Sequence, residues 1–141
     1  MSHILIRYSR FMRHREAFTA LHNDVFPTTY YDAATIISRL SHNNQLWLLL
    51  EHDKLIGYAY FEVAREFGNA NLHYIAIHPQ AHNQGYGTKL LAETLSHMFA
   101  FDEINDLQLS VTRGNAQANR VYEKVGFVTK RELHNYHLSR S

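Results

Sequence analysis

The sequence predicts an α/β protein with a mixed, mostly antiparallel central sheet and helices on both faces of that sheet. Two observations carry this prediction. Two β-rich runs within 45–66 flank the short segment "EHDK", as in a hairpin, and hairpin strands pair antiparallel. Further on, a strand, a helix and a second strand follow one another over 69–113, and such a connection brings its strands parallel. Helices on both faces would bury such a sheet most economically.

The elements of the N-terminal half follow from the spacing of apolar residues. The segment "HILIRYS" (3–9) alternates weakly and predicts a first strand. Residues 11–26 carry apolar side chains at helical spacing, and Pro27 closes that helix. A second helix is predicted over 30–43 by the same spacing. In the hairpin that follows, Asp53 is expected in the turn.

The C-terminal half continues the alternation. The segment "NANLHYIAIHP" (69–79) is almost wholly apolar at its centre, as a buried strand would be. No repeat, low-complexity tract or linker is visible, so residues 1–141 are interpreted as a single domain with the order β-α-α-β-β-β-α-β-α-β. The remaining expected elements are a helix over 85–101, a strand over 106–113, a helix over 115–126 closed by Gly126, and a last strand over 127–139.

The composition argues against several classes of function. The chain has 141 residues, 45% of them hydrophobic, which is enough to bury a core. Its formal net charge of +1 gives little reason to expect a nucleic-acid partner. No apolar stretch approaches the length of a membrane span, and the apolar run at the N-terminus is too short for a signal peptide. Together with the absence of cysteine, these features favour a cytoplasmic protein.

The eleven histidines are numerous for a chain of this length, but their spacings match no familiar metal pattern. No metal site is therefore expected. The histidines would instead make the net charge of the protein sensitive to pH between about 6 and 7.

One turn has the features of an anion site. In "HPQAHNQGYGTKLL" (78–91) a predicted strand passes through Gly85 and Gly87 into a helix. The first amides of a helix have no partner within it, and the helix dipole adds positive potential there. Glycines at this junction also occur for turn geometry alone, so both interpretations stay open at this point. The spacing fits neither the dinucleotide-binding fingerprint nor the P-loop.

A second pattern follows in "LSVTRGNAQANRVYEKVGF" (109–127). Here a strand ends before Asn115, which is suited to cap the next helix, and Tyr122 lies two turns further along on a similar face. The small side chains of Ala116 and Ala118 keep one side of this helix slim. A tyrosine at such a position is often a core residue, and that alternative also stays open.

Taken together, the two patterns resemble the GNAT superfamily of N-acetyltransferases. That family has a strand, then Gln/Arg-x-x-Gly-x-Gly/Ala, then a helix, and later Asn-x-x-Ala-x-x-x-Tyr-x-x-x-Gly-Phe before a final strand. The first pattern corresponds to residues 82–87, and the second to Asn115, Ala118, Tyr122, Gly126 and Phe127 in register. The expected order of elements also matches, so the resemblance covers essentially the whole chain. His82 and Asn83 depart from it, since they stand where Gln or Arg and often Gly are usual.

The resemblance implies acetyl-CoA as the acetyl donor and assigns residues to it. The backbone of Ile75, Ala76 and Ile77 would lie beside the pantetheine arm, and an amide near Ile77 would stabilise the oxyanion. Asn115 would hydrogen-bond the same arm, with Ala118 on the adjoining helix face. The pyrophosphate would be bound by the turn that contains His82, Asn83, Gln84, Gly85, Tyr86, Gly87 and Thr88.

The resemblance also implies direct attack of a primary amine on the thioester, with Tyr122 protonating the leaving thiolate. The general base is open. Many relatives have a glutamate near the start of the fourth strand, where this chain has Asn69-Ala70-Asn71-Leu72-His73. His73 has a suitable ordinary pKa and is expected to share strand parity with Asn71, Ile75 and Ile77. Glu62 or a chain of waters is the alternative.

The acceptor site is expected between the first two helices, where Phe26, Tyr30 and Tyr31 would line a pocket and Asp24 or Asp32 would meet a cationic amine. Packing of these aromatic residues against the sheet is the alternative. The acceptor class stays open among small amines, amino acids, aminoglycosides and peptide amines. A non-catalytic acyl-CoA-binding module is the rival function. A homodimer with an edge at the histidine- and tyrosine-containing C-terminal strand is also considered.

Overall fold

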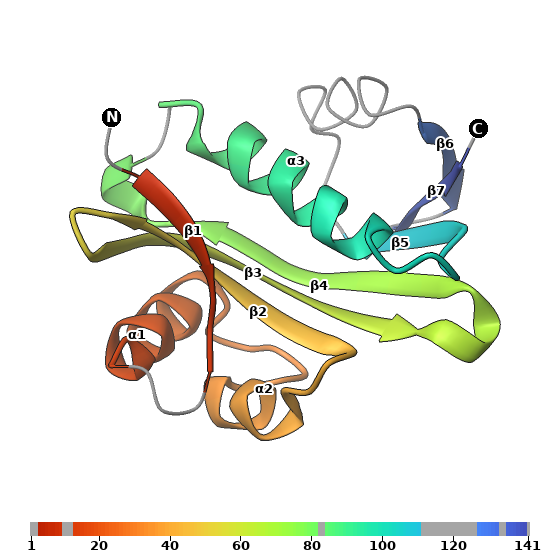
Figure 1. The fold of residues 1–141 in the computed structure, drawn as a ribbon. Helices are drawn as coiled ribbons and strands as arrows, with labels where there is room; N and C mark the ends of the chain where they lie inside the picture. Colours follow the sequence, from red (N-terminus) through yellow and green to blue (C-terminus); the bar gives the residue numbers. More distant parts are fainter. Residues whose placement is uncertain (1–2, 10–12, 82–83, 111–126, 133–134, 141) are drawn as a thin grey trace.

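The computed structural model describes residues 3–9, 13–81, 84–110, 127–132 and 135–140. It shows one mixed sheet with α1 and α2 on one face and α3 on the other (Figure 1). The expected architecture of a mixed, mostly antiparallel sheet with helices on both faces is therefore confirmed. The expected helix over 115–126 lies outside the described residues.

The elements before the turn at Gly85 match the expected ones with shorter helices. Asp32 caps α2, because its carboxylate accepts a hydrogen bond of 2.8 Å from the Thr35 amide. The hairpin is as expected, and its turn residues His52 and Asp53 have positive φ angles of 51° and 65°. These elements are β1 (His3–Arg7), α1 (Arg15–Val25), α2 (Ala33–Arg39), β2 (Asn44–Glu51), β3 (Lys54–Ala64), the 3-10 turn η1 (Arg65–Phe67), β4 (Asn69–Ile77) and the 3-10 turn η2 (Pro79–Ala81).

The strand order in the sheet is β1-β2-β3-β4-β5-β7-β6. The strands β4 and β5 are parallel, as the helix between them requires, and the other neighbouring pairs are antiparallel. This confirms the pairing expected from the connections. The elements after Gly85 are α3 (Tyr86–Phe99), β5 (Asp106–Ser110), β6 (Phe127–Glu132) and β7 (Asn135–Arg140).

The last segment differs from the expectation. Residues 127–139 were expected to form one strand, but they form the hairpin of β6 and β7. The period-2 pattern is the same for one long strand and for two strands, so it does not reveal the reversal. The strand that contains Tyr136 and His137 is β7, which pairs on both sides, whereas β6 lies at the edge. Since β6 belongs to the same C-terminal segment and ends the described sheet, a dimer edge in this segment stays a prediction.

Two apolar cores hold the layers together, one on each face of the sheet. Under α3, Leu90, Leu95 and Met98 are buried against strand residues such as Phe61. Under α1 and α2, Phe18 and Ile36 are buried against Tyr58 and other strand residues. The sheet is therefore covered on both faces, and its central strands are apolar on both sides.

A β-bulge in β4 changes the face of its residues. Asn71 pairs with Glu62 and Leu72 with Phe61, but Tyr74 pairs with Tyr60, so His73 is an extra residue in β4. His73 contacts Glu62 and Tyr60 on the face covered by α1 and α2. Ile75 and Ile77 pack instead against the core under α3. The expectation that His73 shares strand parity with Ile75 and Ile77 is therefore wrong, because the extra residue shifts the alternation.

A glycine allows β3 and β4 to approach closely at the end of β4, where Gly57 pairs with Ile77. A Cβ added at Gly57 would lie 2.8 Å from the carbonyl oxygen of Ala76 and 2.7 Å from Cδ1 of Ile77. The backbone oxygen cannot move without breaking the strand pairing. Gly57 is thus required by packing between the strands.

We expect Gly57→Ala to lower the free energy of unfolding by about 1–3 kcal/mol, because it overpacks this contact. Urea unfolding would measure the change. Gly87→Ala is the matched control, since its added Cβ would have Ile77 Cγ1 at 3.8 Å as its neighbour. A similar loss of stability in both variants would contradict the packing argument.

Candidate active site

The first turn of α3 has the geometry of an anion site. Gly85 precedes the helix with a φ of +80°, in the left-handed region that favours glycine. No atom lies within 4 Å of a Cβ added there, and Gly87 and Thr88 are exposed. Their amides belong to the first turn and have no acceptor within the helix. The glycines therefore leave space above amides that are directed out of the helix end, as a pyrophosphate would need.

Tyr86 holds this turn to the sheet. Among the described residues of the turn (84–88), Tyr86 is the one whose side chain is buried. Its ring joins the core under α3, and its hydroxyl donates a hydrogen bond of 2.5 Å to the Glu51 carboxylate at the end of β2. A role of Tyr86 in coenzyme binding would therefore fall on its backbone, because the side chain is directed into the core.

Several expected coenzyme residues cannot be placed. His82, Asn83, Asn115, Ala118 and Tyr122 lie outside the described residues. Gln84, Gly85, Gly87 and Thr88 are all exposed in the turn or at the start of α3. The structure therefore places Gln84, Gly85, Gly87 and Thr88, while the coenzyme-binding roles of all these residues stay predictions.

The edge of β4 next to this turn fits the expected position of an extended arm. The described pairing with β5 ends at Leu72 and Leu109, although β4 continues to Ile77. On that side, the part of the chain that the structure describes provides no strand partner for residues 73–76. Such an edge can pair with an added extended segment.

The bulge gathers a cluster of polar side chains around Glu62. Arg39 donates two hydrogen bonds to its carboxylate, of 2.7 Å and 3.1 Å. The Tyr60 hydroxyl donates a third, of 2.5 Å, and His73 Nε2 lies 3.3 Å from Oε1. Burial alone would raise the pKa of Glu62, but the hydrogen bonds from Arg39 and Tyr60 outweigh it and lower that pKa. Glu62 is therefore held as a paired carboxylate.

Of His73 and Glu62, the two residues considered as general base, His73 is better suited to accept a proton. Burial lowers the pKa of the imidazole, against the opposing effect of the Glu62 charge. His73 is then neutral near pH 7, and donation from Nε2–H to Glu62 leaves Nδ1 as the acceptor of a proton. Glu62 would have to give up its bond to Arg39 to take that role. The sequence did not reveal Arg39, which comes from α2 and is distant along the chain.

The loop between α1 and α2 is fixed by buried hydrogen bonds. The fully buried His22 bonds the Tyr31 carbonyl through Nε2 at 2.7 Å, so Nε2 carries the proton and Nδ1 accepts from the Tyr58 hydroxyl. The Tyr74 hydroxyl accepts from the Tyr31 amide at 3.1 Å and bonds Thr29 Oγ1 at 2.5 Å. Residues on both sides of Tyr30 are thus held in place.

The three aromatic residues expected at the acceptor site occupy different positions. Phe26 packs edge-on against Tyr74, with ring centroids 5.0 Å apart. Tyr31 is half-buried between the Arg39 guanidinium, 4.8 Å from its centroid, and the His73 ring at 5.4 Å. Tyr30 is 91% exposed and lies 5.1 Å from Tyr31. Tyr30 and Tyr31 therefore extend from the bulge toward solvent.

The sequence model of the Acetyltransferase (GNAT) family matches residues 11–127. The chain belongs to the GNAT acetyltransferase family. The resemblance noted in the two sequence patterns is thereby confirmed. The match extends over the glycine turn, the bulge and the loop between α1 and α2.

Solved GNAT structures share the fold. Arabidopsis thaliana Naa50, in complex with the bisubstrate analogue CoA-Ac-MVNAL, is 19% identical with a TM-score of 0.70, covering 100% of this chain and 99% of that one. The ribosomal-protein-S18-alanine N-acetyltransferase from Escherichia coli is 19% identical, with a TM-score of 0.68 and coverages of 97% and 93%. PaiA N-acetyltransferase from Thermoplasma acidophilum, in complex with coenzyme A, is 17% identical, with a TM-score of 0.67 and coverages of 100% and 99%.

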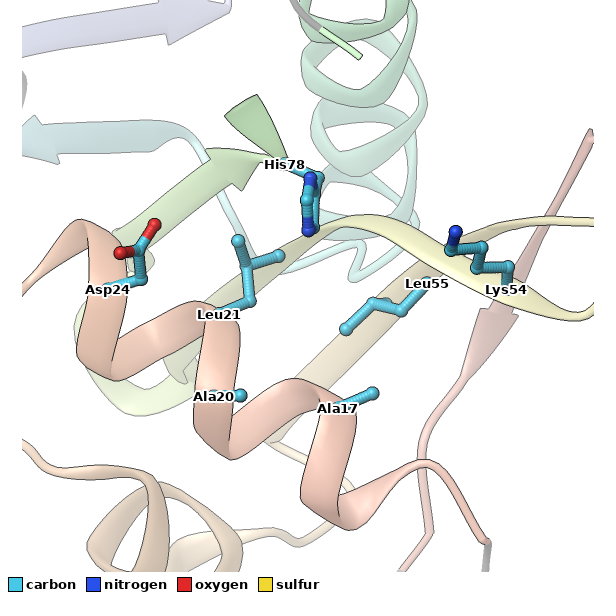
Figure 2. A pocket seen from close by; sticks show the side chains of 7 residues that line it. All are labelled: Ala17, Ala20, Leu21, Asp24, Lys54, Leu55 and His78. Atoms are coloured by element: carbon cyan, nitrogen blue, oxygen red, sulfur yellow. The ribbon is translucent and has the colours of Figure 1, made fainter. Parts of the chain in front are cut away.

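A separate depression of about 510 Å³ lies along α1 of this GNAT protein (Figure 2). Ala17, Ala20, Leu21 and Leu55 contribute its apolar lining, and Asp24, Lys54 and His78 add polar groups. Asp24, one of the two carboxylates considered for the acceptor amine, thus lies here. The other, Asp32, is occupied as the N-cap of α2.

Neither of two other kinds of site emerges from the described residues. Within them, no group of three or more His, Cys, Asp or Glu side chains is arranged to hold a metal ion. No helix in the same part of this GNAT chain is long and apolar enough to span a membrane.

The buried His22 should make the stability of this GNAT protein fall in acid. Burial lowers the pKa of His22, although the Tyr31 carbonyl and Asp32 oppose the effect. Below about pH 6.5 the unfolded chain then binds a proton that the folded chain does not, so stability decreases as pH falls, by at most about 1.4 kcal/mol per pH unit for one group.

Unfolding free energies from urea titrations at several values between pH 7.5 and 5 would measure this slope. His22→Gln should flatten it, whereas His42→Gln, at an exposed position, should leave it as in the wild type. Burial also lowers the pKa of His73 and His97, so the slope should be reduced rather than abolished. An unchanged slope in His22→Gln would contradict the assignment.

Proposed function

We propose that the protein transfers the acetyl group of acetyl-CoA to a primary amine. Family membership supports the donor, and the observation that carries the chemistry is the neutral His73 beside Glu62 at the bulge of β4. The exposed glycine turn at the start of α3 would bind the pyrophosphate, and the edge of β4 at Ile75 and Ala76 would pair with the pantetheine arm.

In this proposal His73 takes a proton from the acceptor ammonium, and the resulting amine attacks the thioester carbonyl carbon. A C–N bond forms and the C–S bond breaks. The nitrogen loses its second proton to solvent, and the thiolate leaves as a thiol after protonation by Tyr122, the role that the family resemblance implies. Glu62 acts as a positioning residue, because it orients His73 through Nε2.

The acceptor is expected to be a peptide or small-molecule amine. The Naa50 structure carries an analogue that joins coenzyme A to a peptide, and the Escherichia coli relative is named for a ribosomal-protein alanine. These names support a peptide amine as one of the acceptors to be tested. A non-catalytic coenzyme-binding module remains the rival, and turnover decides between the two.

Coenzyme binding is tested at Gly87. Gly87→Leu should raise the Kd for acetyl-CoA by about ten- to a hundredfold, because the side chain would displace a phosphate from the first-turn amides. Calorimetric titration would measure the Kd. The residue has an ordinary φ, so a side chain there causes no backbone strain.

Ser96→Leu is the matched control, since Ser96 is exposed on the same helix but away from the first turn. It should leave the Kd unchanged. If Gly87→Leu is folded and also binds acetyl-CoA like the wild type, the turn does not bind the pyrophosphate.

Catalysis is tested at His73 and Tyr122. His73→Gln should lower kcat by about a hundredfold or more, the usual contribution of a general base, without changing the Kd for acetyl-CoA. Because burial lowers the pKa of His73, wild-type kcat/KM should decrease with falling pH only below about pH 6.5. Thiol release would be followed over a panel of amines.

His97→Gln is the matched control. Burial also lowers the pKa of this histidine, but it stacks on Trp47, 3.6 Å away between ring centroids, on the α3 side of the sheet. If acetyl-CoA binds but no amine gives turnover, the rival module is favoured. Unchanged turnover in both His73→Gln and Tyr122→Phe would contradict the proposed roles of these residues as base and acid.

A further inference from the structure

We propose that the acceptor carries a single ammonium group attached to an apolar or aromatic body, and that Tyr30 contacts that body. This inference rests on the proposed acetyltransferase function and narrows its acceptor. Polyamines and aminoglycosides, which carry several ammonium groups, would then be poor acceptors.

The charges beside His73 cancel. Glu62 is the carboxylate that contacts the imidazole, and Arg39 pairs with it through two hydrogen bonds. Because Tyr60 and His73 occupy the same carboxylate, an incoming ammonium would have to displace one of these partners. A second or third ammonium would therefore be desolvated without a matching anion.

One neutral acceptor is available for an ammonium N–H. Asn71 lies opposite Glu62 across the strand pair, so both side chains are on the same face as His73. Its Oδ1 atom is buried and has no hydrogen-bond partner among the described residues. A buried carbonyl oxygen of this kind is suited to one donor, and it adds no negative charge that would favour a polycation.

The carboxylates of Asp24 and Asp32 add no free negative charge beside His73. Asp32 accepts from Thr35 as the N-cap of α2, and this hydrogen bond lowers the pKa of its carboxyl. Asp24 lies along α1 in the separate depression that Lys54 and His78 also line (Figure 2). Neither carboxylate is directed at His73 by any described contact.

Tyr30 provides a preformed contact surface for the body of the acceptor. Its neighbours Thr29 and Tyr31 are held by the hydrogen bonds to Tyr74 and His22, so the backbone loses little freedom when a ligand binds. A tyrosine fixed in this way contributes contact area at low cost in conformational entropy. The ring remains 91% exposed, which leaves its faces available.

The order of the rings determines where the apolar body lies. Tyr31 contacts His73, and Tyr30 contacts Tyr31 on the solvent side, with centroid separations of 5.4 Å and 5.1 Å. An amine that reaches His73 would extend past these two rings toward solvent. Its nearest substituents would therefore meet aromatic surface.

The test is a comparison of kcat/KM for thiol release from acetyl-CoA with four acceptors. These are phenethylamine, a tripeptide that begins with phenylalanine, spermidine and an aminoglycoside such as kanamycin. We expect kcat/KM for phenethylamine or for the tripeptide to exceed kcat/KM for both polycations by about tenfold or more. A factor of about ten corresponds to the loss of one favourable contact. The phenethylamine and peptide arms show whether the amine comes from a small molecule or a chain end.

Two variants connect the preference to the proposed residues. Tyr30→Ala should lower kcat/KM for the apolar acceptors about two- to tenfold and leave the polycations unchanged. Phe67→Ala is the matched control, because Phe67 is also exposed, at 75%, but lies in the turn between β3 and β4. Arg39→Gln should raise kcat/KM for spermidine relative to kcat/KM for phenethylamine, since it removes the cation paired with Glu62.

Equal or better turnover of a polycation by the wild type would overturn the inference and leave the acetyltransferase function intact. So would an unchanged ratio of acceptors in both Tyr30→Ala and Arg39→Gln. If no amine in the panel is acetylated, the proposed function fails together with the inference.

Discussion

The structure depends on the extra residue in β4. Without this insertion, the pairing of β3 with β4 would continue in one register, and Ile75 and Ile77 would lie on the same face as Asn71 and His73. Because of the bulge, Ile75 and Ile77 instead pack under α3, while His73 stays beside Glu62 on the face covered by α1 and α2. The described pairing with β5 stops at the residue before it, Leu72. A single local irregularity thus separates the face of His73 from that of Ile75 and Ile77, and it lies where the described pairing of β4 with β5 ends.

Apart from Asn71 Oδ1, the polar groups named around the bulge are tolerable in a covered sheet because they satisfy one another. Glu62 accepts hydrogen bonds from Arg39 and Tyr60, and His22 has both ring nitrogens bonded in its neutral form. An unpaired charge in this layer would cost far more than these bonds contribute. The same bonds link α1, α2, β3 and β4, so they also fix the loop that presents Tyr30. The same buried hydrogen bonds therefore stabilise the packing of these elements and fix the position of the loop.

The sequence predicted what depends on local periodicity. The helix over 85–101 is α3 at 86–99, the hairpin around Asp53 is present, and the parallel pair follows from the helix between its strands. It did not predict the bulge, because one inserted residue leaves the local composition of β4 unchanged while it reverses every later side chain. Nor did it predict the reversal between β6 and β7, or the contact of Arg39 with Glu62, which joins residues 23 positions apart.

For the candidate site, the sequence identified the glycine turn and the aromatic loop but did not distinguish the roles within them. Gly85 has a positive φ, whereas Gly87 has an ordinary φ and no neighbour nearer than 3.8 Å to an added Cβ, so space for a ligand would be the explanation of Gly87 alone. Gly57, which no motif marked, is required by a backbone contact. Such distinctions need the positions of atoms from other strands, which no local pattern contains.

The proposed donor and acceptor sites are placed relative to each other by one strand. His73 lies within β4 and Ile77 ends it, so at about 3.3 Å per residue the bulge and the end of the strand are roughly 13 Å apart. The turn at Gly85 follows the strand end and is joined to β2 through Tyr86 and Glu51. A donor that uses both sites must therefore be extended along β4. Its acyl end would arrive at the bulge, where His73 lies on the face covered by α1 and α2 while Ile75 and Ile77 lie on the α3 face. The fold itself would thus bring the two substrates together from opposite sides of the sheet.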